Sequence, residues 1–398
     1  MERFILPNFS VEQSLMKAKS YANKGDIAQA QKLYETILKN FSNNLRAQQG
    51  LASLKKYNLN QNTQSPPQEV VDQLVNLYNQ GQFAVVTEQA HVLAEQYPYE
   101  PVLWNILGAS RSQIGMLEEA IDAYKKTISL KPDYVEAYSN MGVAYRNMGK
   151  PDEAIDAYKK AISIYPNYSE AYNNLGNVLQ NTGQLDKAIA AYKKVIFFKP
   201  NDANAHYNLA AAFKDQGNLE EAIKAYNKTL KIKPDHAEAY NNLGIVLKDQ
   251  GKLDEAIDAH KQSILLKPLD AKAYFNLGNV LREQLELDEA IEYYSKSISL
   301  KPDYTEAYNN MGLALYYQGK SEEAIQIYTK AISKDPLSPE THKNLGYALL
   351  RSGRLKEGLD EIEWRWKTDK FLGQKRKFSQ PLWDGKQSLN GKRILLWC

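Results

Sequence analysis

Seven asparagines recur at one fixed spacing, and each brings the same chemistry. A side-chain amide offers two N–H donors and one oxygen acceptor, so it can pair with the N–H and C=O groups of a peptide backbone. Asparagine is a mediocre helix former, so its regular use inside helices lowers stability a little each time. One amide per repeat could hold an extended chain without reading its side chains. The seven asparagines, 34 residues apart, are Asn140, Asn174, Asn208, Asn242, Asn276, Asn310 and Asn344.

A second interpretation of this asparagine row stays open. The same amides can bridge neighbouring helices of a stack, in which case the row is a packing feature. The two interpretations differ in a measurable way. Removal of the amides lowers affinity for a partner in the first and leaves it unchanged in the second.

Four basic residues form a second periodic set, six positions after members of the row, with Gln180 interrupting them. A polar residue follows each one directly, as Asp249 and Glu283 show. These adjacent rows predict either a polar groove for a mixed-charge peptide or paired, solvated surface charges that contribute little. The basic residues are Arg146, Lys214, Lys248 and Arg282.

No catalytic or metal-binding constellation is found in the sequence. The five histidines lack the spacing of metal ligands. Cys398, the one cysteine, is a terminal residue, and the phosphate-loop match at Gly391-Lys392 fails because Arg393 replaces the required Ser or Thr. We therefore expect no active site, metal or cofactor. Three histidines are expected in the core, because they occupy aromatic positions of the repeat: His206, His260 and His342.

The asparagines belong to a longer repeat that must position them. Most of the 34-residue units have an aromatic or histidine residue before the asparagine, a glycine soon after it, a small residue further on and a closing proline. In one unit these are Tyr138, Gly142, Ala154 and Pro166. The pattern resembles the tetratricopeptide repeat (TPR) family, in which each unit is a helix–turn–helix.

The resemblance implies an all-α fold, a right-handed TPR superhelix of about ten helix pairs. Its concave groove, lined mainly by the first helix of each pair, would bind protein or peptide segments. The asparagine row is similar to the ladder that lines the superhelix of protein O-linked N-acetylglucosamine transferase.

Local signals within one unit agree with a helix pair. Tyr138 and Gly142 fall on one helical face, and Gly149 is placed to end that helix. Gly142 is expected to be small because two helices cross closely there. Acidic residues just after three of the closing prolines have the spacing of a capping box, which predicts helix starts at Asp133 with Glu136, Asp235 with Glu238, and Asp303 with Glu306.

The pattern weakens toward both ends of the chain. We expect degenerate repeat or cap helices at residues 1–57, a linker at 58–68 around Pro66-Pro67, and the repeat array at 69–366. Four of the five tryptophans and a basic cluster at residues 367–377 come at the end. Residues 367–398 are therefore expected to be a connector and the first strand of a missing or truncated α/β domain.

The last residues carry a second resemblance. A Glu-Trp-Arg stretch at residues 363–365, Pro-x-Trp-Asp-Gly at 381–385 and Gly-Lys-x-Ile-Leu at 391–395 resemble the junction to a glycosyltransferase-B-like domain of bacterial TPR proteins. The resemblance implies that this chain recruits substrates for a catalytic domain that these residues do not contain. The basic cluster could touch phosphate or nucleic acid, but its short length favours a solvated connector.

Composition narrows the class of partner. The net charge is +3, with 50 basic and 47 acidic residues, so nothing points to nucleic acid or a membrane surface. No run approaches the ~18 apolar residues of a membrane span. A single cysteine excludes a disulfide framework and fits a cytoplasmic location.

The sequence thus predicts a protein-interaction scaffold that binds extended peptide or protein segments through the asparagine row and the four basic residues. The alternative is the substrate-recruiting N-terminal part of a TPR glycosyltransferase, either glycosyltransferase-B-like or similar to the O-linked N-acetylglucosamine transferase. Partner identity and oligomeric state do not follow from the sequence.

Overall fold

The computed structural model describes residues 10–23, 26–61 and 65–364, and its elements within these ranges are helices, with no strand. The expected strand at 391–398, the basic cluster at 367–377 and the two motifs at 381–395 lie outside the described residues. The chain divides into two compact units, Met1–Pro200 and Asn201–Cys398. The all-α prediction is confirmed for the described part of the chain.

The first unit holds α1 (Val11–Asn23), α2 (Ile27–Asn40), α3 (Leu45–Gln61), α4 (Gln68–Asn79), α5 (Phe83–Gln96), α6 (Pro101–Gln113), α7 (Leu117–Leu130), α8 (Val135–Asn147), α9 (Pro151–Ile164), α10 (Ser169–Asn181) and α11 (Leu185–Phe198). The second unit holds α12 (Ala203–Asp215), α13 (Leu219–Ile232), α14 (Ala237–Asp249), α15 (Leu253–Leu266), α16 (Ala271–Glu283), α17 (Leu287–Leu300), α18 (Thr305–Tyr317), α19 (Ser321–Lys334), α20 (Pro339–Arg351) and α21 (Leu355–Ile362).

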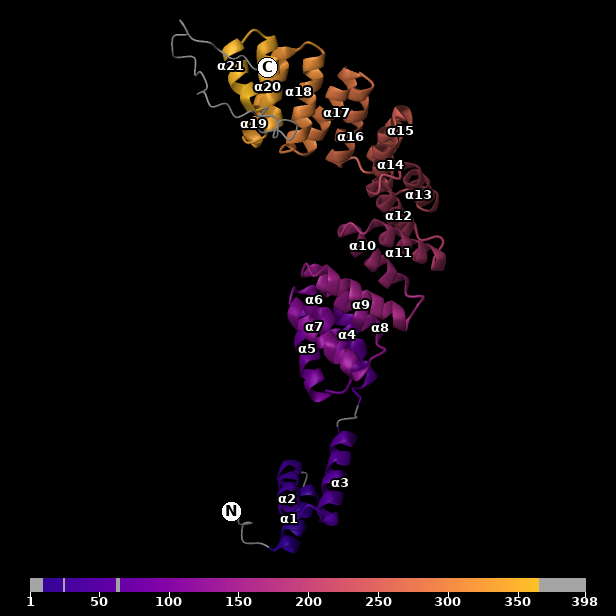
Figure 1. The fold of residues 1–398 in the computed structure, drawn as a ribbon, viewed down its shortest axis with the longest axis vertical. Helices are drawn as coiled ribbons and strands as arrows, with labels where there is room; N and C mark the ends of the chain where they lie inside the picture. Colours follow the sequence, from indigo (N-terminus) through magenta and orange to yellow (C-terminus); the bar gives the residue numbers. More distant parts are fainter. Residues whose placement is uncertain (1–9, 24–25, 62–64, 365–398) are drawn as a thin grey trace, which may run out of the picture. The chain divides into compact units, whose positions relative to one another are not determined.

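Helices that follow one another pack in pairs, as Figure 1 shows for α6 with α7 and α16 with α17. Eight pairs run from α6 to α21, and α1 with α2 and α4 with α5 form two weaker pairs in the described range. This agrees with the expected ten repeats. We call the two members of each pair from α6 onward its first and second helix.

A glycine in the left-handed region makes the turn inside most pairs. Gly149 has a φ of 72°, its N–H donates to Arg146 O over 3.0 Å, and Lys150 N donates to Tyr145 O over 2.9 Å. These two bonds satisfy carbonyls that the helix end would otherwise leave unpaired. In the turn between α16 and α17 the same conformation is taken by Leu285, with a φ of 65°.

The two helices of a pair approach closely where glycine faces a large ring. A Cβ built on Gly142 would lie 2.6 Å from Cε1 of Tyr158, and the Tyr158 side chain is fully buried. The same arrangement joins Gly176 to Tyr192. Between α14 and α15, the ring facing Gly244 is that of a histidine, His260. The sequence prediction of a close crossing at Gly142 is confirmed.

The predicted capping boxes are wrong. Helices α8 and α18 begin after Tyr134 and Tyr304, which form no side-chain cap. Helix α14 is capped by the ring of His236. Each helix therefore starts one residue later than the box requires, so the acidic side chains cannot act as the cap. Asp202 and Asp270 do cap α12 and α16, one residue further along their repeats.

The N-terminal helices form a small core of their own. Ala18, Ala30, Tyr34 and Ile37 are buried between α1, α2 and α3. Helix α3 continues to Gln61, so the expected linker at 58–68 is helical over its first four residues. At the other end, the ring of Trp364 stacks on His342 with 4.0 Å between ring centroids.

Candidate functional site

The asparagine row lies on first helices only. Its members occupy the same place on successive first helices, and all are half-buried. Asn140 and Asn174 lie in the first unit, on α8 and α10, and the other five lie in the second unit, on α12, α14, α16, α18 and α20. The second unit therefore presents five amides on one face of its first helices.

Four amide nitrogens of the row donate to the preceding first helix. Asn276 Nδ2 donates to Asn241 Oδ1 over 3.0 Å, and Asn344 Nδ2 donates to Asn309 Oδ1 over 3.1 Å. Asn242 Nδ2 donates to the Tyr207 hydroxyl over 2.8 Å. In these three bonds the acceptor is 35 residues earlier in the chain.

Asn310 shows that the partner depends on what its neighbour offers. The residue 35 positions before it is Phe275, which has no side-chain acceptor. Its Nδ2 donates instead to Asn279 Oδ1 over 2.8 Å. The row thus contributes to helix packing, while the amide oxygens of its last four members accept no hydrogen bond from any residue that the structure describes.

Sequence reasoning missed the acceptors of these bonds. Asn241 and Asn309 stand immediately before row members, and Asn279 belongs to the next turn of α16. The repeated Asn-Asn pair at 241–242 and 309–310 was the signal that two amide rows exist side by side.

The four basic residues lie near the ends of first helices, half-buried, and contact polar neighbours. Lys248 Nζ is 3.2 Å from Asp249 Oδ1, and Lys214 Nζ is 3.8 Å from Asp215 Oδ1. Both lysine side chains are 32% exposed, so these pairs contribute little to stability. Arg146 donates to Asn147 Oδ1 over 3.4 Å.

Arg282 differs from the other basic residues. Its Nε donates to the Tyr294 hydroxyl over 3.4 Å, and that hydroxyl donates to Asn279 Oδ1 over 2.8 Å. The guanidinium is therefore linked to the amide network instead of the adjacent Glu283. Its remaining N–H groups are the kind of donors that bind a carboxylate or a peptide carbonyl.

His260 lies at the junction of the amide row and the helix core. The ring is 1% exposed, and Nδ1 is 3.1 Å from Asn241 Oδ1, the oxygen that also accepts from Asn276. Because that oxygen only accepts, Nδ1 must carry the proton. Burial, and then the charge of Lys248, lower the pKa of His260 to about 4. The ring is neutral near pH 7.

The expected core histidines are confirmed. His206, His260 and His342 are 8%, 1% and 7% exposed. Among the described residues no group of three His, Cys, Asp or Glu side chains could hold a metal ion. None of the helices in the described ranges is long and apolar enough to cross a bilayer.

Family comparisons agree with the helix pairs. A family model described as the Cilia and flagella-associated protein 70 C-terminal domain matches residues 45–309. Tetratricopeptide-repeat models match residues 14–44, 293–326 and 312–353. Together these matches cover most of the array.

Curated relatives share short stretches. The chain is 48% identical over 50 residues to the peroxisomal targeting signal receptor of Candida albicans, which is 13% of this chain and 8% of the receptor. It is 34% identical over 70 residues to the receptor of that name from Kluyveromyces lactis, 18% of this chain and 12% of the receptor. The chain thus spans only a small part of the length of these relatives.

Among solved structures, the chain resembles the MamA protein, at 35% identity and a TM-score of 0.40, over 42% of this chain and 92% of that one. It also resembles YrrB, described as a TPR protein with an unusual peptide-binding site, at 24% identity and a TM-score of 0.42, over 50% of this chain and 100% of that one.

Proposed function

Because the chain belongs to the tetratricopeptide-repeat family described as the Cilia and flagella-associated protein 70 C-terminal domain, we propose that it is an interaction scaffold whose first helices bind an extended peptide segment through the asparagine row. The observation that carries this proposal is the state of the amides. The nitrogens of the last four members are held by neighbouring helices, while their oxygens accept nothing from the described residues; these members are Asn242, Asn276, Asn310 and Asn344.

A fixed amide is a better binding group than a free one. Each nitrogen bond sets the orientation of its amide before any ligand arrives, so less conformational freedom is lost on binding. The open oxygens then accept N–H groups from a peptide backbone, which is why the row can bind without selecting side chains. This refines the expectation from sequence, in which each amide supplied both donor and acceptor.

The basic residues would add selectivity. Lys214, Lys248 and Arg282 lie on three successive first helices of the second unit. A peptide with carboxylates at matching positions would replace their weak contacts with Asp215, Asp249 and Tyr294. The short stretches shared with peroxisomal targeting signal receptors support a peptide as the class of ligand.

The test uses dodecapeptides selected from a random displayed library on the intact chain, with affinities measured by fluorescence anisotropy. We expect N276A/N344A to weaken binding at least tenfold. The matched control N241A/N309A removes acceptors of the inter-helix bonds but keeps every row oxygen, and should change affinity less than threefold. Equal losses in both variants, or none in the first, would show that the row only packs helices.

The glycosyltransferase alternative rests on residues 363–395, nearly all outside the described range. It predicts that the source reading frame continues into an α/β domain, and that the complete product binds a nucleotide sugar. We also propose a cytoplasmic location, which fractionation of the source cells would test.

A further inference from the structure

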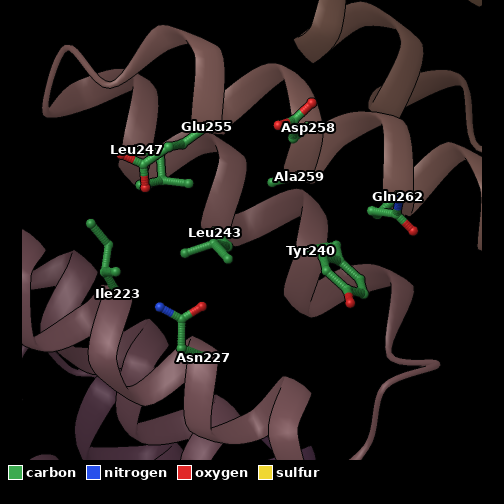
Figure 2. A pocket seen from close by; sticks show the side chains of 9 residues that line it. All are labelled: Ile223, Asn227, Tyr240, Leu243, Leu247, Glu255, Asp258, Ala259 and Gln262. Atoms are coloured by element: carbon green, nitrogen blue, oxygen red, sulfur yellow. The ribbon is translucent and has the colours of Figure 1, made fainter.

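A hollow of about 260 Å³ lies between α13, α14 and α15, away from the asparagine row. Figure 2 shows Leu243 of α14 between Asn227 of α13 and Ala259 of α15. The floor is apolar and the α15 side carries carboxylates. We call this space the α13–α15 hollow. It is lined by Ile223, Asn227, Tyr240, Leu243, Leu247, Glu255, Asp258, Ala259 and Gln262.

The charge of this hollow has no counterpart in the other repeats between α7 and α19. Along α15 the face toward α13 carries Glu255, Asp258 and then Gln262. At the position of Gln262 every other second helix from α7 to α19 has a lysine. Those lysines are Lys126, Lys160, Lys194, Lys228, Lys296 and Lys330.

The opposite side of the hollow also lacks a cation. Asn227 of α13 stands where α7, α9, α11 and α15 have lysine. Asp122 and Asp156, at the position of Asp258, are 3.9 Å and 3.7 Å from the lysine three residues later. Neither Glu255 nor Asp258 forms an ion pair or hydrogen bond with any residue that the structure describes. Lys261 holds the equivalent place on α15 but forms no ion pair with Asp258, so both carboxylates of the hollow are unpaired among the described residues.

The same face of α15 ends in exposed apolar side chains. Leu265 is 71% exposed and Leu269, just beyond the helix, is 82% exposed. The position of Leu265 is a serine in α7, α9, α17 and α19. An occupant that brings both apolar side chains and positive charge could cover Leu265 and Leu269 and pair with the exposed carboxylates in a single contact.

We propose that the α13–α15 hollow docks residues 365–378 of the same chain, a segment outside the described range. Its sequence has six basic residues against one acidic residue, Asp369, and interleaves them with Trp366, Phe371, Leu372 and Phe378. Lysines of this segment pair with Glu255 and Asp258, and an aromatic or leucine side chain covers the floor at Leu243. The charge and the apolar groups of the two surfaces are complementary.

The attachment point of this segment lies in the same unit as the hollow. The segment leaves the second unit at Trp364, just after α21, and α15 is three pairs earlier in the same unit. Two pairs, α16 with α17 and α18 with α19, lie between them in the chain. The eleven residues from Arg365 to Lys375 reach roughly 36–40 Å when extended. A tether of that length keeps the segment at a millimolar effective concentration, on the order expected for short linkers.

Zero-length carbodiimide crosslinking of the full chain, read by mass spectrometry, tests the contact. We expect Lys370, Lys375 or Lys377 to link to Glu255 or Asp258. The variant E255Q/D258N should lower the yield of tail-to-array links at least tenfold. The matched control E119Q/D122N, at the equivalent positions of α7, should leave it unchanged. Absence of links to Glu255 and Asp258, or equal yields at Glu119 and Asp122, would overturn the proposal.

Charge exchange and isotope mixing complete the test. K375E/K377E should lose the links, and adding E255K/D258K should restore them with the roles of lysine and carboxylate reversed. Failure of this restoration in a chain with wild-type circular dichroism contradicts the pairing.

In an equal mixture of ¹⁴N and ¹⁵N chains, the links should join peptides of one label only. Mixed-label pairs would assign the contact to a second copy and overturn docking within the chain.

Discussion

At the crossing of α8 and α9, the Tyr158 ring packs directly against Gly142. A Cβ on the glycine would lie 2.6 Å from the ring. Because the ring is fully buried among close-packed neighbours, it has no free volume into which to move. In this pair the position of the Tyr158 ring therefore requires a glycine at residue 142.

Gly142→Ala should destabilise the array by about 1–3 kcal/mol, because overpacking outweighs the better helix propensity of alanine, which is worth about 1 kcal/mol. Urea unfolding followed by circular dichroism measures the effect. Ala210 stands at the same position opposite Tyr226, in a pair already built around a methyl group. Ala210→Gly should also destabilise, by leaving a gap. A stabilising Gly142→Ala would refute the steric account.

Leu285→Gly should stabilise the protein by about 1 kcal/mol. Leu285 has a φ of 65°, a conformation that costs a non-glycine residue about 1–2 kcal/mol, and its side chain is 77% exposed, so little packing is lost. Gly251→Leu makes the reverse change in the preceding repeat and should destabilise. The comparison is a shift in urea midpoint. Shifts of the same sign in both variants would contradict the prediction.

His260 should make stability depend on pH. Its pKa is about 4 in the folded protein, below the ordinary 6.5, because of burial and the charge of Lys248. Between these values the unfolded chain binds more protons, so this contribution is fully present above pH 6.5 and is lost as pH falls toward 4. The loss is on the order of 3 kcal/mol.

The variant His260→Tyr isolates this effect, because tyrosine occupies the same position in most other repeats. Carboxylates titrate equally in both proteins, so the difference in unfolding free energy between pH 7 and pH 4.5 should be smaller in the variant. The same difference in both proteins would mean that His260 is not the titrating group.

The bond between Asn309 and Asn344 should show energetic coupling. Single replacement of either residue by alanine should destabilise by about 0.5–1.5 kcal/mol, the net value of a typical hydrogen bond. The double variant should cost less than the sum of the two, by about 0.5 kcal/mol or more. Strict additivity would show that the 3.1 Å contact contributes nothing.

The helix pairs could be predicted from sequence because each depends on residues close together in the chain. Gly149 as a turn and Gly142 as a crossing point are local features, and both predictions hold. The capping boxes failed by one residue, since helix starts are set by how Tyr134 and Tyr304 pack, which spacing alone does not encode.

The polar contacts were harder to predict because they combine separate repeats. The other three amides bond to the residue 35 positions earlier, but Asn310 bonds to Asn279. The residue 35 positions before Asn310 is Phe275, whose side chain has no acceptor. Likewise, the α13–α15 hollow is acidic because Asn227 and Gln262 both replace lysines on different helices. Each replacement removes one positive charge from its own helix. Their combined effect becomes visible only in the structure, where both residues line the same hollow.

The two kinds of contact along the array respond differently to mechanical load. Water cannot replace the packing contact between a buried ring and a glycine inside a pair. A half-buried amide between first helices can exchange its hydrogen bond for one to water. Under tension we expect neighbouring pairs to separate at the amide row while each pair keeps its shape. The chain would then lengthen between pairs, where the amides share the load with buried side chains such as Ile325 and Leu345.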